Sequence, residues 1–197
     1  MDEQSLRRDG SGTWWGYVHR RVLRPRLGVA APDAAAAIVH AGGLLLDRVM
    51  AGWDVVAMLA DPDTAVPLRI LGVAVFDLEG PLSAPMHHVW PDAVIVAPPL
   101  FGDARVRDGV RECLDRRAVT VLSWGEDLPA DLAPRFRPYP YRLSMAARAF
   151  KARALAAADL PSSAVAATEA LQIGRSAEGP VLDRAGSGGV CGGSGSR

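Results

Sequence analysis

Two short apolar runs joined by a segment with helical periodicity form the clearest pattern along the chain. The runs cover 93–97 and 119–122, and because each is too short for a helix and is bounded by turn residues, we expect buried strands. Between them apolar residues recur at i, i+4, i+7 and i+8, which predicts a helix over 104–117 that Asp103 can cap. A strand, an amphipathic helix and a second buried strand predict a βαβ crossover, and hence a parallel sheet with helices on its faces.

A second amphipathic helix is expected over 33–51, capped by its first residue. Gly42 and Gly43 interrupt its middle and leave two interpretations open. Either the helix packs closely on the sheet there, in spite of a cost of about 1 kcal/mol per glycine, or the segment splits into a short strand, a phosphate-binding glycine turn and a second helix. We favour close packing because the sequence contains no G-x-G-x-x-G pattern, and we then expect His40 to be a partly buried histidine rather than a ligand.

The remaining elements have weaker periodicity. Strands are expected over 53–60 and 68–76, and because the segment between them is too short for a crossover, they either pair antiparallel or are not adjacent. The proline-rich segment 135–141 is expected to be an extended turn that leads into a helix over 142–158. Its apolar face is predicted to consist of Leu143, Ala147, Phe150 and Ala154, with Lys151 on a flank.

These elements predict an α/β fold. We expect a mostly parallel, open sheet of about four to five strands with helices on both faces, a C-terminal helical extension and a flexible tail. The predicted organisation is a disordered segment 1–12, a basic aromatic arm 13–32, an α/β domain 33–158, a short helix 159–174 and a disordered tail 175–197.

Composition changes this picture in two respects. The net charge of the 197 residues is zero, but 33–133 carries fifteen acids against seven arginines, whereas 1–32 and 134–153 are basic. An acidic body with two basic flanks predicts contacts between these parts or with an anionic partner. The chain also has only two cysteines, no membrane-spanning run and no apolar signal segment, so we expect a cytoplasmic location.

Residues 90–124 resemble the middle of a response-regulator receiver domain, a flavodoxin-like fold. In that family the first of the two strands ends in the phosphorylated aspartate and the second ends in a serine or threonine. Here Ala97 stands at the position of the aspartate, and Ser123 matches the hydroxyl residue. The resemblance implies a related α/β fold without phosphoryl transfer at this position, because Ala97 offers no oxygen nucleophile.

A ligand site in such a sheet is expected beyond the carboxyl ends of the parallel strands. We call this surface the rim. Its candidate residues are Asp61, Asp63, Phe101, Asp103, Ser123, Trp124 and Glu126. Several carboxylates on one rim could hold Mg²⁺, but acids in loops are usually solvated, so we predict no metal, no cofactor and no catalytic residue. A shallow aromatic pocket at Phe101 and Trp124 is an equal alternative.

Missing catalytic motifs and segregated charge together favour a non-catalytic regulatory or interaction protein. Its contacts with a protein or nucleic-acid partner are expected from the basic aromatic flanks, through Trp14, Trp15, Arg20, Arg21, Arg135, Arg137, Tyr139 and Tyr141. The alternative is a small-molecule or nucleotide-binding enzyme that uses the rim. A third hypothesis is self-association through exposed tryptophans into a homo-oligomer.

Overall fold

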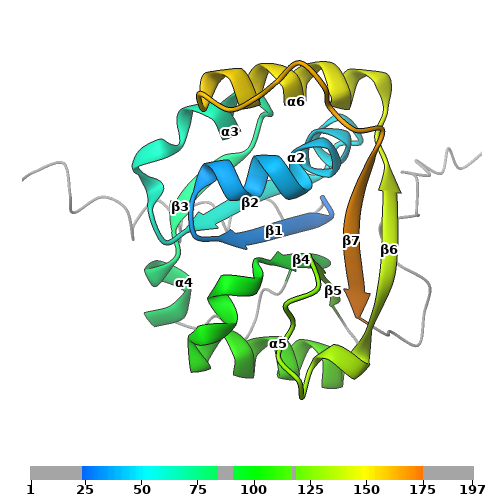
Figure 1. The fold of residues 1–197 in the computed structure, drawn as a ribbon. Coiled ribbons are helices and arrows are strands. Elements are labelled where there is room, and N and C mark those ends of the chain that lie inside the picture. Colours follow the sequence, from blue (N-terminus) through cyan, green and yellow to red (C-terminus); the bar gives the residue numbers. More distant parts are fainter. Residues whose placement is uncertain (1–23, 84–90, 117–118, 175–197) are drawn as a thin grey trace, which may run out of the picture.

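The computed structural model describes residues 24–83, 91–116 and 119–174, which form one sheet covered by helices (Figure 1). Seven strands lie in the order β3-β2-β1-β4-β5-β7-β6. They are β1 (Arg26–Ala31), β2 (Asp54–Leu59), β3 (Ala74–Asp77), β4 (Ala93–Val96), β5 (Thr120–Trp124), β6 (Phe136–Arg142) and β7 (Thr168–Gly174). Strands β1 to β5 are parallel to their neighbours within this group, whereas β7 runs antiparallel to both β5 and β6.

Helices lie on both faces of the sheet, as predicted. One face is covered by α2 (Ala34–Met50), α3 (Val66–Ile70) and α6 (Met145–Ala157), and the other by α5 (Ala104–Arg116). The connections contain α4 (Glu79–Ser83) and the 3-10 turns η2 (Pro62–Thr64), η3 (Pro98–Gly102) and η4 (Ala133–Arg135). None of the helices in the described part of the chain has the length and apolarity needed to span a bilayer.

The sheet divides the core into two parts because side chains alternate between its faces. On β4 and β5, Ile95 and Leu122 belong to the core under α2 and α6, which we call the α2-side core. Val96 and Val121 belong to the core under α5, which we call the α5-side core. The strands therefore lie between two separately packed layers.

The βαβ unit predicted first is confirmed. β4 and β5 pair in parallel, with Ile95 opposite Leu122, and α5 connects them. The stripe predicted for α5 is buried. The helix predicted over 33–51 is also confirmed as α2, whose cap Asp33 accepts a hydrogen bond from the Ala36 amide at 2.7 Å.

The α/β class is confirmed, but the sheet is larger than predicted and is mixed rather than mostly parallel. Residues 26–31, assigned to the basic arm, form the interior strand β1 between β2 and β4, and the rest of that arm lies mostly outside the described residues. The strand begins with Arg26 and follows Arg24 and Pro25, and three of its six residues are glycine or alanine, so the basic flank obscured a short buried strand. Residues 168–174, assigned to a C-terminal helix, form β7, where Glu169, Leu171 and Ile173 are buried at the alternate spacing of a strand.

The region 68–76 was predicted as one strand and contains two elements. Residues up to Ile70 belong to α3, and the strand β3 begins at Ala74. The prediction that the two strands were antiparallel or not adjacent is wrong, since α3 provides a compact crossover that lets β2 and β3 pair in parallel.

The proline-rich segment predicted as an extended turn is the edge strand β6. Proline cannot donate a ladder hydrogen bond, so it is tolerated at an edge, and Pro138 and Pro140 lie there opposite Gln172 and Ala170 of β7.

The order of the parallel strands also corrects the flavodoxin-like interpretation. Flavodoxin-like and receiver domains arrange their strands as 2-1-3-4-5. The parallel strands here follow the order 3-2-1-4-5. The pairing of β4 with β5 is shared by both arrangements, which is why residues 90–124 resemble a receiver domain although the complete sheet does not.

Candidate functional site

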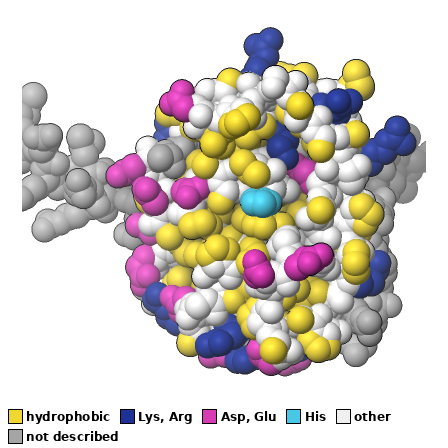
Figure 2. Space-filling model, in the orientation of Figure 1, with side chains coloured by type: hydrophobic (Ala, Val, Ile, Leu, Met, Phe, Trp, Pro, Cys, Tyr) yellow, Lys and Arg dark blue, Asp and Glu magenta, His cyan; other side chains and the backbone are white. Residues whose placement is uncertain are grey.

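A histidine stacked on a tryptophan occupies the rim at the end of β5. The rings of His40, from the middle of α2, and Trp124, the last residue of β5, are 5.1 Å apart between centroids and 8° from parallel. Trp124 is only 4% exposed, whereas His40 is exposed. Figure 2 shows a histidine side chain at the surface, surrounded by hydrophobic side chains and with acidic ones nearby. We call this pair the His40–Trp124 stack; a stacked aromatic pair contributes about 0.5–1.5 kcal/mol beyond its area.

The surroundings of His40 favour its neutral form. Partial burial lowers the pKa of the imidazole below its ordinary value, and the positive charge of Lys151 lowers this pKa further. A neutral imidazole has one nitrogen free to accept a proton or hydrogen bond. His40 can therefore act as a proton acceptor at neutral pH.

Beneath His40, a buried ion pair binds the backbone of α2. Lys151 of α6 and Glu169 of β7 are joined by a contact of 2.6 Å between Nζ and Oε1, and their side chains are 7% and 3% exposed. The Gly43 and Leu44 amides donate to the two carboxylate oxygens of Glu169 at 2.7 and 2.9 Å. Lys151 Nζ also donates to the Val39 carbonyl at 2.7 Å, the acceptor that the Gly43 amide would use in a regular helix.

The two interpretations of the glycine pair can now be compared with the structure. The α2 helix continues through both glycines, so the close-packing interpretation is confirmed for the helix as a whole and, against the sheet, at Gly43. Gly42 lies against Leu71 and Lys151 rather than against a strand. A Cβ atom added to Gly43 would lie 2.2 Å from Leu143 Cδ2 and 3.1 Å from Glu169 Oε1. The alternative interpretation expected a bound phosphate at these glycines. Instead, a carboxylate of the chain itself, that of Glu169, accepts the hydrogen bond from the Gly43 amide.

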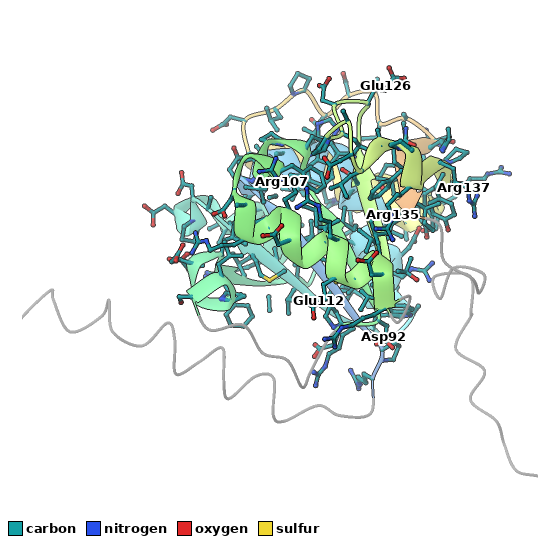
Figure 3. All side chains as sticks on the ribbon, turned by 90° about the horizontal axis from the view of Figure 1, so that it is seen from below. Asp92, Arg107, Glu112, Glu126, Arg135 and Arg137 are labelled. Carbon is teal, nitrogen blue, oxygen red and sulfur yellow. The ribbon has the colours of Figure 1, made fainter. Side chains whose placement is uncertain are left out.

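The acidic candidates on the rim are used locally rather than converging. Asp61 caps η2 by accepting the Asp63 amide at 3.2 Å, and both residues are exposed. Asp103 accepts the Arg105 amide at 2.8 Å and pairs with the Arg105 guanidinium, which lowers the pKa of this carboxyl group. Glu126 projects into solvent at the opposite end of the molecule from Asp92 (Figure 3). Across the described ranges, no three His, Cys, Asp or Glu side chains gather to hold a metal ion.

The aromatic pocket expected between Phe101 and Trp124 is not formed. Phe101 is buried in the α5-side core, whereas Trp124 is buried in the α2-side core. Ser123 is fully buried and its hydroxyl donates to the Val96 carbonyl at 2.7 Å. Of the seven rim candidates, Trp124 is thus the one that takes part in the stacked site.

The predicted partner contacts that can be located mostly contact the chain itself. Arg135 forms an ion pair with Asp115 at 2.8 Å, and Tyr139 packs against the α2-side core. The Tyr141 hydroxyl donates to Asp47 and accepts from Arg48, both at 3.1 Å. Arg137 is exposed and points outward in Figure 3. The other four contacts, Trp14, Trp15, Arg20 and Arg21, lie outside the described residues.

Sequence reasoning missed the buried lysine because it assigned the faces of the α6 helix incorrectly. The buried stripe is Ala147, Lys151, Ala154 and Leu155, whereas Phe150 is 45% exposed. The available signal was that Lys151 is the only lysine among 22 basic residues and has the i+4 spacing from Ala147. Neither observation reveals Glu169, which was assigned to a different kind of element.

Comparison with known proteins identifies the kind of fold. No protein-family model matches the chain, and no curated protein sequence matches it. Solved structures of the same mixed α/β architecture exist, and two of them are deacetylases.

The first is the A40926 pseudoaglycone deacetylase, which aligns with a TM-score of 0.50 and 14% identity over 77% of this chain and 97% of that chain. The second is a deacetylase in complex with teicoplanin, from the teicoplanin biosynthesis pathway. It aligns with a TM-score of 0.52 and 12% identity over 76% of this chain and 96% of that chain. At this level of identity the likeness establishes a shared fold.

These structures correct the main functional hypothesis. We expected a non-catalytic regulatory or interaction protein, but the two solved structures described above, which share this fold, are enzymes. The finding contradicts that hypothesis, and the alternative, a small-molecule or nucleotide-binding enzyme that uses the rim, is therefore the one developed as a proposal below. The original inference gave too much weight to missing sequence motifs, which do not reveal a site assembled from distant elements.

Proposed function

We propose that the chain is an enzyme that binds a small molecule at the rim, over the His40–Trp124 stack. The observation that carries this proposal is an exposed histidine with a lowered pKa, fixed on a buried indole at the carboxyl end of β5. Ligands of open α/β sheets bind at this end of the strands. The imidazole ring of His40 lies among hydrophobic side chains, and such a surface favours a ligand with an apolar or planar face. The imidazole nitrogens favour a ligand that also carries a hydrogen-bonding group beside that face.

Deacetylation is the first reaction to examine, because two solved structures of this fold are deacetylases. In such a reaction a neutral imidazole can accept a proton from water while the water oxygen adds to the acyl carbon. The imidazolium then returns the proton to the leaving nitrogen as its bond to carbon breaks, which releases acetate and an amine. His40 is the residue we propose for both proton transfers. A cytoplasmic location remains part of the proposal, since the described cysteine, Cys113, is free and buried.

A thermal-shift screen with paired ligands tests the binding part of this proposal. The panel contains N-acetylglucosamine with glucosamine, and teicoplanin with its deacetylated form. A ligand of the folded state raises the melting temperature. We expect at least one acetylated compound to raise it in the natural chain, with a smaller shift for the partner that lacks the acetyl group.

Two variants on the same helix localise the effect. His40→Gln removes the proton acceptor, while Met50→Gln changes a residue of α2 that is 72% exposed and outside the proposed site. The shift should disappear in the first variant and persist in the second. Acetate release should follow the same pattern. No shift with any compound, or an equal shift in both variants, would count against the rim as the ligand site.

A further inference from the structure

The buried Lys151–Glu169 pair binds the backbone of α2 in addition to forming an ion pair. It makes three hydrogen bonds to the backbone of α2, all between Val39 and Leu44, the segment that contains His40. Both side chains are almost completely buried. A buried ion pair by itself is a weak source of stability, since hydrophobic residues of similar volume often do as well. Its three backbone contacts therefore indicate a geometric role.

The strand that carries Glu169 also carries the neighbour of Trp124. In β7, Leu171 is paired with Trp124 of β5, and Glu169 lies two residues away on the same side of the strand, equally buried. The strand thus pairs with Trp124 and also binds the backbone of α2 one turn after His40. It holds Trp124 through the sheet ladder and holds the turn of α2 around His40 through the Glu169 carboxylate.

Lys151 binds the backbone of α2 on the N-terminal side of His40, whereas Glu169 binds it on the C-terminal side. Its ammonium group bridges Glu169 and the Val39 carbonyl, the residue that directly precedes His40. The stem of Lys151 also passes 3.6 Å from the position that a Cβ atom on Gly42 would occupy. The backbone on both sides of His40 is therefore fixed, on one side by a cation and on the other by an anion.

We propose that Lys151 and Glu169 are positioning residues that hold the imidazole of His40 on the indole of Trp124. Neither residue needs to touch the ligand. Their importance for binding rests on the proposed function of the rim, but their effect on the geometry of the stack does not.

The experiment compares the natural chain with a double variant, Lys151→Met together with Glu169→Gln. This change removes both charges at once, so that no unpaired charge remains buried, and a Gln oxygen can still accept one amide. The single variant Glu169→Gln is measured beside it. The matched control is Val110→Ala, which weakens the α5-side core without touching α2.

The readout is the NMR chemical shift of the His40 ring protons, assigned by their absence in His40→Gln. An imidazole stacked on an indole has resonances displaced upfield by the ring current, and the size of this displacement depends on geometry. Because Lys151 also affects the pKa of His40, the spectra are compared at a pH high enough for His40 to be neutral in every variant, so that protonation does not change the resonances. We expect the displacement in the natural chain and in Val110→Ala, and its loss in the double variant at a temperature where all proteins remain folded. Glu169→Gln should lose less of it than the double variant.

Two outcomes separate this inference from the proposed function. A displacement that persists in the folded double variant overturns the positioning role, whatever the ligand screen finds. A displacement that is lost, together with a natural chain that binds no compound in the screen, supports the positioning role and refutes the rim as a ligand site. If both proposals are correct, the double variant loses the stack and also loses the ligand-induced rise in melting temperature.

Discussion

Three helical glycines allow the packing of α2 to be tested with the same substitution in three environments. Gly42 and Gly43 lie side by side in α2, and Gly109 lies in the interior of α5. Replacing glycine by alanine in a helix gains about 1 kcal/mol from backbone propensity alone. What distinguishes the three positions is the space available for one methyl group.

The expected magnitudes follow from that space. At Gly109 the added Cβ meets nothing within 4 Å, so the full gain of about 1 kcal/mol should appear. At Gly42 its nearest neighbour is Ile38 Cγ2 at 3.3 Å, so a small adjustment should leave stability nearly unchanged. At Gly43 the methyl group would lie 2.2 and 2.4 Å from two atoms of Leu143, one of them its branch-point carbon. Overpacking of this kind costs about 1–3 kcal/mol, and it exceeds the propensity gain.

Urea denaturation of the three single variants and the natural chain measures these differences. For a chain of this length, 1 kcal/mol corresponds to a change of about 2–4 °C in melting temperature, so calorimetry gives an independent check. The order of stability should be Gly109→Ala, then Gly42→Ala, then Gly43→Ala, with about 1–3 kcal/mol between the first and the last, since the propensity gain is common to both and the overpacking cost is not. Equal stability of the two α2 variants would refute the close approach of Leu143 and Glu169 to Gly43.

Three further predictions concern His40, Cys113 and Asp33. The pKa of His40 in the folded chain lies below its ordinary value, so the unfolded chain binds the proton more readily. The contribution of neutral His40 to the free energy of unfolding is therefore complete above about pH 6.5, and it is lost as the pH falls from there through the folded pKa. The unfolding free energy of His40→Gln should therefore fall less on acidification than that of the natural chain, and parallel curves would contradict this. Burial raises the pKa of the Cys113 thiol to about 11. In a chain that carries Cys191→Ser, alkylation of Cys113 by iodoacetamide at pH 8 should therefore be at least roughly a hundredfold slower in the folded chain than in the chain unfolded in urea. Equal rates would show that the thiol is accessible in the folded chain. Replacing the helix cap in Asp33→Ala should cost about 1 kcal/mol in urea denaturation, while Asp33→Asn should cost little, and equal losses would show that the cap is not responsible.

The elements predicted correctly are those whose local pattern agrees with their final environment. The stripe of α5 and the apolar runs around it required no knowledge of distant residues, and α2 was predicted from its cap and its period. The strands β1 and β7 were missed because their neighbours in sequence gave a different signal. A basic segment precedes β1, while β7 follows a loop rich in small residues, and its exposed alternate positions weaken its apolar character.

The candidate site shows a second limit. Trp124 was placed on the rim because a residue after a predicted strand must lie there, whichever strands are its neighbours. Its partner His40 was considered only as a histidine of the α2 helix, since nothing local indicates that α2 crosses the end of β5. The role of Glu169 depends on β7 inserting between β5 and β6, a non-consecutive pairing that no short stretch of sequence specifies.

The two prolines of β6 have a consequence for the molecule in a crowded solution. Since β6 remains paired with β7, the positions that lack an N–H group at Pro138 and Pro140 are those directed away from β7. A strand from another molecule that approached this border would find carbonyl groups but no donors at these two places. Ordered stacking of chains into fibrils is thereby discouraged at this border of the sheet.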